Sequence, residues 1–111
     1  MRIGVRCRRV EDPAGVRAHA EKRLGFALSR FRDAVEEVDV SLDDENGPRG
    51  GPAIRCVIRV TGTRGWEVVV SDEAADPLEA VDRAAGRLGR AVAREMEKRR
   101  GFDARREGVE R

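Results

Sequence analysis

The chain has 111 residues, which is near the commonest size of a single domain. Charged residues make up 40% of it, but the formal net charge is only +2, so overall charge identifies no partner. No apolar run approaches the roughly 20 residues of a membrane-spanning helix, and the N-terminal residues lack the apolar core of a signal peptide. Cys7 and Cys56 are far apart in the sequence and form no CxxC motif. This pattern is typical of buried, unpaired cysteines in a reducing compartment. We therefore expect a soluble, cytoplasmic protein with no membrane contact, disulfide or metal.

Strand and helix patterns alternate along the first half of the chain. Residues 2–10 alternate apolar and polar side chains, which is the pattern of a half-buried strand. Asp12 and Pro13 supply a cap and a first helical residue, and apolar side chains at helical spacing then predict a helix over about 13–33. Residues 35–42 alternate again, with an acidic or small outer face, and predict the second strand.

The second half predicts a hairpin and a long helix. Residues 44–52 are rich in glycine and proline and indicate a turn, after which residues 53–61 and 66–71 alternate as two paired strands. Asp76 and Pro77 repeat the cap and the first helical residue, and predict a helix that ends near residue 100. Its expected buried stripe consists of Leu78, Val81, Ala85, Leu88, Val92 and Met96.

The element order β-α-β-β-β-α predicts an α+β domain over residues 1–100, followed by a flexible tail over 101–111. We expect a four-stranded mixed sheet with both helices packed on one face, similar to a double-stranded-RNA-binding domain. The first two strands should run parallel because a helix connects them, and the second to fourth should be antiparallel. The other face of the sheet should be open to water.

Charge is segregated along the chain. Residues 1–35 carry nine bases and four acids, residues 36–45 carry six acids and no base, and residues 83–100 carry seven bases and two acids. At 100° per residue, five bases of the second helix share one face, which we call the basic ridge: Arg83, Arg87, Arg90, Arg94 and Lys98. The ridge points away from the expected apolar stripe and spans about 22 Å, enough for several phosphate contacts. Mixed charges would solvate a helix equally well, so the near-absence of acid favours polyanion binding.

A second, weaker patch lies on the first helix, where His19, Lys22, Arg23, Phe26 and Arg30 fall within about 100° of one another. Phe26 either stacks on a base or packs against the second helix, and packing is the simpler interpretation. The chain has four aromatic residues and no tyrosine, so contacts through phosphates and shape fit structured RNA better than stacking on single strands.

No arrangement of side chains indicates catalysis. His19 has no triad partners in the sequence pattern, and no phosphate-binding glycine-rich motif is present. The acids at 43–45 and 72–76 lack the spacing of a calcium loop. We expect no enzymatic activity, no cofactor and no small-molecule substrate.

Three features together resemble the bacterial ribosome hibernation-promoting factor family, also called ribosome-associated translation inhibitors or sigma-54 modulation proteins, in its short single-domain form. They are the element order, the DxNGPRGG turn at Asp44–Gly51 followed by Cys56 in a strand, and the DPLEAVDR segment at Asp76–Arg83 that leads into the second helix. The resemblance covers about residues 1–100. Leu78 stands where the family pattern has tyrosine.

The resemblance implies a factor that binds the small ribosomal subunit and its rRNA, occludes the decoding sites for mRNA and tRNA, and inactivates or protects idle ribosomes under stress. It also implies RNA contacts from bases on both helices, namely Lys22, Arg23, Arg30, Arg83, Arg87, Arg90, Arg94 and Lys98. Long members carry a further dimerisation domain that has no counterpart in this sequence, so we expect a monomer.

A different class of function stays open from the residues alone. The acidic second strand and the basic second helix would also suit a small interaction module that binds a protein partner or another copy of itself. A partner retained after digestion of RNA would favour this alternative.

Overall fold

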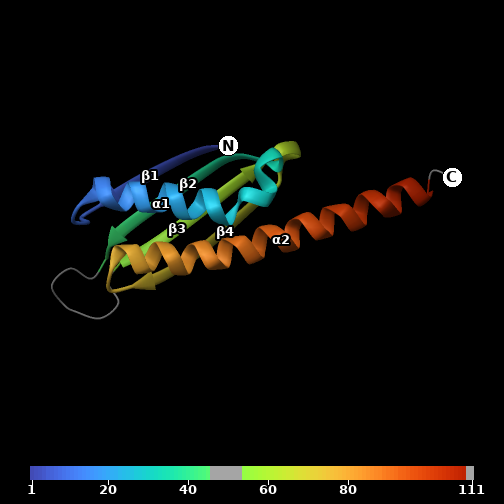
Figure 1. Ribbon diagram of the computed structural model, residues 1–111. Coiled ribbons are helices and arrows are strands. Elements are labelled where there is room, and N and C mark those ends of the chain that lie inside the picture. The colour runs from blue at the N-terminus through green and yellow to red at the C-terminus, as the bar shows by residue number, and fades with distance from the viewer. Residues whose placement is uncertain (46–53, 110–111) are drawn as a thin grey trace.

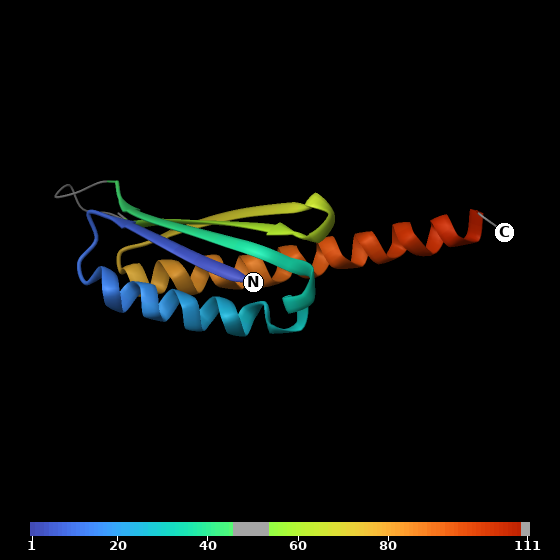
Figure 2. The same ribbon diagram turned by 90° about the horizontal axis from the view of Figure 1, so that it is seen from above.

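The computed structural model describes residues 1–45 and 54–109, with side chains described as far as residue 101. The elements in chain order are β1 (Arg2–Arg8), α1 (Pro13–Ala27), the 3-10 helix η1 (Ser29–Ala34), β2 (Val35–Asp44), β3 (Ile54–Gly62), the 3-10 turn η3 (Thr63–Gly65), β4 (Glu67–Ala74) and α2 (Pro77–Val109). The strands form one sheet in the order β1-β2-β3-β4, and both long helices lie on the same face of it (Figures 1 and 2). The predicted α+β architecture is confirmed. The predicted glycine-rich turn lies mostly outside the described residues.

Strand pairing follows the alternation of the sequence. β1 pairs with β2 in parallel, whereas β2 with β3 and β3 with β4 are antiparallel, as predicted. One row across the sheet runs from Val5 through Val40 and Ile58 to Val70, and these side chains face the helices. Because side chains alternate between faces along a strand, a one-residue slip would expose the whole row.

The hydrophobic core fills the space between the sheet and the two helices. Its largest fully buried side chains are Leu24, Leu28, Leu42, Ile58, Leu88, Val38, Val40, Val60, Val81, Val92 and Cys56. None of the buried residues in the described part of the chain is polar or charged. The two helices also pack against each other, so the core is closed on the helix side by their contact (Figure 2).

The first helix is shorter than the sequence pattern predicts. α1 begins at Pro13, with the Asp12 side chain accepting from Gly15 N at 3.2 Å, but it ends at Ala27 instead of near residue 33. Ser29–Ala34 forms η1, whose first turn is closed by a 2.9 Å hydrogen bond from Phe31 N to Leu28 O. Gly25 and Ser29 are weaker helix formers than the residues before them, which favours this end.

The second helix differs from its prediction in both extent and buried face. α2 continues to Val109, so the predicted end near residue 100 is wrong, and its last turns project beyond the sheet (Figure 1). Arginine, glutamate and alanine, which recur in this part of the sequence, have high helix propensity and favour the continuation. Leu78 is 39% exposed, whereas Ala80 and Ala84 are fully buried. The buried face is wider than the predicted stripe because α2 packs on β3, β4 and α1 at once.

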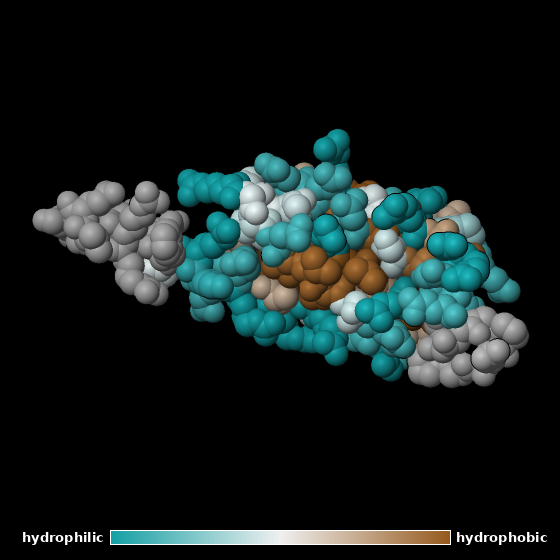
Figure 3. Space-filling model, turned by 180° about the vertical axis from the view of Figure 1, so that it is seen from behind, coloured by the Kyte–Doolittle hydropathy of each residue, from teal (hydrophilic) through white to brown (hydrophobic). Residues whose placement is uncertain are grey.

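The far face of the sheet is open, as predicted, and Figure 3 shows it directly. Hydrophilic side chains surround an apolar area in this view. The strand register places the half-buried Val57 and the exposed Val69 on this face. Several charges pair across strands or at their ends, for example Arg9 with Asp43 at 2.8 Å.

The two thiols should differ in reactivity. Burial raises the pKa of Cys56 to about 12, so the reactive thiolate is rare at pH 8. Burial also raises the pKa of Cys7, but this side chain is only half-buried. We expect Ellman's reagent at pH 8 to modify at most one thiol of the native protein within minutes, and both in denaturant. Reaction of both native thiols at the rate of free cysteine would contradict the burial of Cys56.

Candidate nucleic-acid interface

The five bases of the basic ridge all lie exposed on α2. The prediction that the ridge points straight away from the core is wrong. Since Ala80 and Ala84 widen the buried face toward the ridge, its arginines lie beside β4, the edge strand of the sheet. The ridge therefore borders a groove between α2 and β4, with Lys98 farther along the helix.

Two ridge residues are held by acids of the same protein. Arg83 lies 3.0 Å from Glu79 one helical turn earlier, and Arg87 Nε donates to Asp72 Oδ2 of β4 at 2.9 Å. The Asp72 carboxylate also accepts from Glu73 N at 2.8 Å. The hydrogen bond from the Glu73 backbone first, and then that from Arg87, hold the pKa of Asp72 below its ordinary value. Sequence reasoning missed Asp72, since its position beside Arg87 depends on how α2 crosses the sheet.

Arg90 and Arg94 are the ridge residues most available for binding. Both are exposed, and the structure shows no acid paired with either within the described ranges. Together with Arg87 they line the groove beside β4, which has a volume of about 380 Å³. Sites for small molecules are mostly apolar, whereas three of the residues that line this groove are arginines, which suits an extended anion.

The helix-one patch is split by a contact with α2. Arg23 Nε donates to Asp82 Oδ1 at 3.0 Å, and His19 Nε2 lies 2.7 Å from the same oxygen. Arg23 is thus half-buried and bridges the two helices, instead of standing free as the wheel suggested. Its remaining guanidinium nitrogens have no other protein partner in the described structure, so Arg23 is oriented by Asp82 along the seam between the helices.

Asp82 is the acid that joins the two helices. Partial burial opposes its ionisation, but the hydrogen bonds from His19 and Arg23 and their charges outweigh this cost and lower its pKa below the ordinary 3.8. Since the folded pKa lies below the unfolded one, the ionised carboxylate stabilises the fold above about pH 3.8, and this contribution is lost as pH falls through the folded pKa. Sequence reasoning used Asp82 only as part of a motif and did not assign it a partner.

Replacing Asp82 by Asn should weaken the contact between the helices modestly. The side chain is 46% exposed, so solvent screens the pair, and we expect a loss of about 0.5 kcal/mol in the free energy of unfolding at pH 7. The loss should shrink as the pH falls below 3.8 and through the lowered pKa of folded Asp82, because the wild-type carboxylate is then protonated as well. Urea denaturation at pH 7 and pH 3 measures both values. Asp33→Asn, at an exposed site in η1, is the matched control, and an equal loss there would refute the role of the pair.

The other helix-one residues lie apart from this contact. Lys22 is exposed on α1, and Arg30 lies in η1, with its guanidinium carbon 5.0 Å from the centre of the Phe31 ring. Phe26 is 78% exposed, so the interpretation that it packs against the second helix is wrong. α1 turns Phe26 outward while its neighbours Leu24 and Leu28 fill the core.

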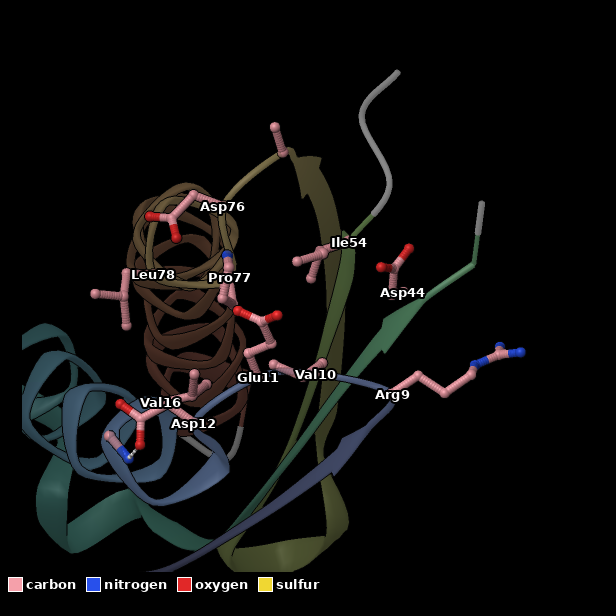
Figure 4. Close-up of a pocket in the computed structure, with 12 residues that line it drawn as sticks. Arg9, Val10, Glu11, Asp12, Val16, Asp44, Ile54, Asp76, Pro77 and Leu78 are labelled. Carbon is pink, nitrogen blue, oxygen red and sulfur yellow. Dashed lines mark hydrogen bonds between the residues drawn. The ribbon is translucent and has the colours of Figure 1, made fainter. Parts of the chain in front are cut away.

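A separate hollow lies where α1 and α2 begin, at the end of the sheet (Figure 4). Asp12 and Asp76, which cap the two helices, border it together with Glu11 and Leu78. Within residues 1–45 and 54–101, no group of three or more His, Cys, Asp or Glu side chains is placed to hold a metal ion. Asp12 and Asp76 accept hydrogen bonds from the first turns of α1 and α2, whereas His19 lies elsewhere, on the seam between the helices beside Asp82.

None of the helices, in the part of the chain that the structure describes, is long and apolar enough to cross a membrane.

The fold is that of a ribosome-associated class of proteins. The family model described as "Sigma 54 modulation protein / S30EA ribosomal protein" matches residues 3–100, and the chain belongs to this family. The family consists of ribosome-associated factors of the subunit-interface and hibernation type and is not a known enzyme family. A search of curated proteins found no match.

Two solved structures have the same fold. The N-terminal domain of Protein Y from Thermus thermophilus is 32% identical, with a TM-score of 0.67 over 85% of this chain and 98% of that one. A ribosomal subunit interface protein from Coxiella burnetii is 16% identical, with a TM-score of 0.63 over 87% of this chain and 99% of that one. At that identity the second similarity concerns the fold alone.

Proposed function

We propose that this protein binds the small ribosomal subunit through rRNA, occludes the decoding sites for mRNA and tRNA, and thereby inactivates or protects idle ribosomes under stress. The observation that carries the proposal is the pair Arg90 and Arg94, exposed beside a groove on a member of a ribosome-associated family. A ribosome partner implies a cytoplasmic location.

The proposed contacts are electrostatic and come from both helices. Arg90, Arg94 and Lys98 supply charges on α2, and Lys22 and Arg30 supply charges on α1 and η1. Arg23, Arg83 and Arg87 also contribute, each held in place by an acid. Such contacts release counterions from RNA, so affinity should fall steeply with salt. No covalent step is involved, and the mechanism is exclusion of other ligands from the same site.

Sedimentation with purified subunits tests the proposal. At low salt the protein should migrate with the small subunit, and it should dissociate as the salt concentration is raised. Small subunits that already carry mRNA and tRNA should not bind the protein. Protein that stays at the top of the gradient with small subunits at low salt would overturn the proposal. Equal binding of the protein to small subunits with and without bound mRNA and tRNA would overturn the proposed occlusion.

A protein partner is the alternative, and the structure gives it less support. Of the acids of β2, Asp43 pairs with Arg9 and Glu37 lies 3.9 Å from Arg2, so this acidic segment is partly neutralised within the molecule. A complex that survives nuclease digestion of the RNA would nevertheless favour this alternative.

A further inference from the structure

The free edge of β4 faces the basic ridge. Among the described strands β4 has β3 as its only neighbour, so within residues 1–45 and 54–109 half of its backbone groups have no strand partner. The groove beside it is lined by Val69, Val70, Ser71, Arg87, Arg90, Ala91 and Arg94. Residues of the edge strand β4 therefore form one wall of the groove, and residues of α2, among them three arginines, form the other.

The hydrogen-bond pattern of the hairpin identifies which backbone groups face the groove. Gly62 N donates to Trp66 O at 2.9 Å, which makes these two residues a hydrogen-bonded pair. Bonded and non-bonded pairs alternate along an antiparallel ladder, so every second residue after Trp66 bonds to β3. The N–H and C=O groups of Val69 and Ser71 therefore point away from β3, toward the free edge.

Glu73 supports this assignment and shows where the open edge ends. By the same alternation its N–H also points outward, and it donates to the Asp72 side chain at 2.8 Å instead of to β3. Asp72 is in turn held by Arg87 at 2.9 Å. The acid nearest the groove is thus occupied, and the open stretch of the edge lies at Val69 and Ser71, beside Arg90 and Arg94.

We propose that this edge binds the ribose-phosphate backbone of RNA. The N–H groups of Val69 and Ser71 donate to phosphate oxygens, their carbonyls accept from ribose 2′-hydroxyls, and Arg90 and Arg94 neutralise the phosphates. Outward groups two residues apart on a strand are about 6.6 Å apart, comparable to the distance between successive phosphates. The inference rests on the proposed function and adds a contact that recognises ribose, which charge alone does not.

RNA suits this groove better than an added peptide strand. An extended peptide would also satisfy the edge, but it would need several acidic side chains to meet the arginines. RNA supplies an anion at each nucleotide and a hydroxyl donor between anions. The charge of the groove wall therefore favours RNA.

Removing one outward N–H tests the donor half of the proposal. Ser71→Pro deletes it on an edge strand, where proline is tolerated if the lost N–H faces solvent. Ser71→Ala keeps the N–H and is the matched control. Fluorescence anisotropy with an RNA hairpin of about 20 base pairs at about 50 mM salt should show about 5- to 10-fold weaker binding for Ser71→Pro and no change for Ser71→Ala. An ester replacing the amide N–H of Ser71 removes the same donor if the proline variant fails to fold.

Methylating the ribose tests the acceptor half. The same hairpin with 2′-O-methyl riboses has no 2′-hydroxyl donors, so wild-type protein should bind it several-fold more weakly. Equal affinity for the two hairpins, or wild-type affinity of the Ser71 ester variant, would overturn the proposal. If the Ser71→Pro variant loses binding to a protein partner but still binds the hairpin, the proposal would also be overturned, in favour of strand addition by a peptide.

These outcomes are separable from failure of the proposed function. If Arg90→Glu/Arg94→Glu abolishes binding to the hairpin and to the small subunit while the Ser71 ester binds normally, the backbone contact at the β4 edge is wrong and the ribosomal function stands. If the wild-type protein binds neither RNA nor the small subunit, both proposals fall.

Discussion

The double substitution Arg90→Glu/Arg94→Glu should reduce affinity for the small ribosomal subunit by at least about 100-fold at about 100 mM salt. Both side chains are exposed and line the groove beside β4, and each reversal replaces an attraction to phosphate with a repulsion. The dependence of log affinity on log salt should also become shallower by about 1.5 to 2, since two phosphate contacts are lost. Sedimentation or anisotropy titrations over a series of salt concentrations measure both quantities.

A charge-matched control separates a local contact from a general effect of charge. Arg90→Glu and Arg6→Glu each change the net charge by the same amount, but Arg6 lies exposed on the open face of the sheet, opposite the helices. We expect the Arg90 variant to bind much more weakly than wild type, and the Arg6 variant to bind nearly as well. Similar losses from both would indicate attraction without a defined site. Circular dichroism should show unchanged helix content, because neither residue contributes to the core.

Gly62→Ala should be the most damaging single-methyl change to the fold. Gly62 is buried at the end of β3, and an added Cβ would overlap the indole ring of Trp66, itself only 4% exposed. The backbone at Gly62 is ordinarily extended, so the cost comes from packing and not from conformation. We expect a loss of about 1–3 kcal/mol in the free energy of unfolding and a melting temperature lower by roughly 5–15 °C. Displacement of Trp66, the only tryptophan, should shift its fluorescence to the red.

Gly25→Ala is the matched control for this substitution. An added Cβ at Gly25, within α1, meets no described atom within 4 Å, and alanine favours helix over glycine by up to about 1 kcal/mol. The variant should therefore be as stable as wild type or more so. Equal stability of the Gly62 and Gly25 variants in thermal unfolding would show that the region around Trp66 is loosely packed.

One face of α2 packs in the core and the adjoining face carries the arginines, and this separation explains how a small domain presents so many cations without unfolding. Leu88 and Val92 anchor the helix on the sheet and are fully buried, while the ridge arginines remain exposed on the adjoining face. Two ridge arginines are restrained by Glu79 and Asp72, which lowers the entropy that they lose on binding. Arg90 and Arg94 keep their full charge for the ligand.

The amino-acid sequence by itself determined the element order, the pairing directions of the strands and the position of the basic ridge on the second helix. These features depend on local periodicity: alternation at Val38, Val40 and Leu42 indicates a strand, and the spacing from Arg83 to Lys98 indicates a helical face. The family resemblance also followed from short motifs in that order, and the match over residues 3–100 confirmed it.

The tertiary structure alone decided which of the bases are free and what lies beside them. Arg23 meets Asp82, 59 residues away, and Arg87 meets Asp72, 15 residues away, because α2 packs on β4 and α1 together. A helical wheel places side chains around one axis and contains no neighbouring elements, so it could show neither these pairs nor the free edge of β4 beside Arg90. The predicted packing of Phe26 against the second helix and the predicted burial of Leu78 were wrong for the same reason, since exposure depends on where the other elements end.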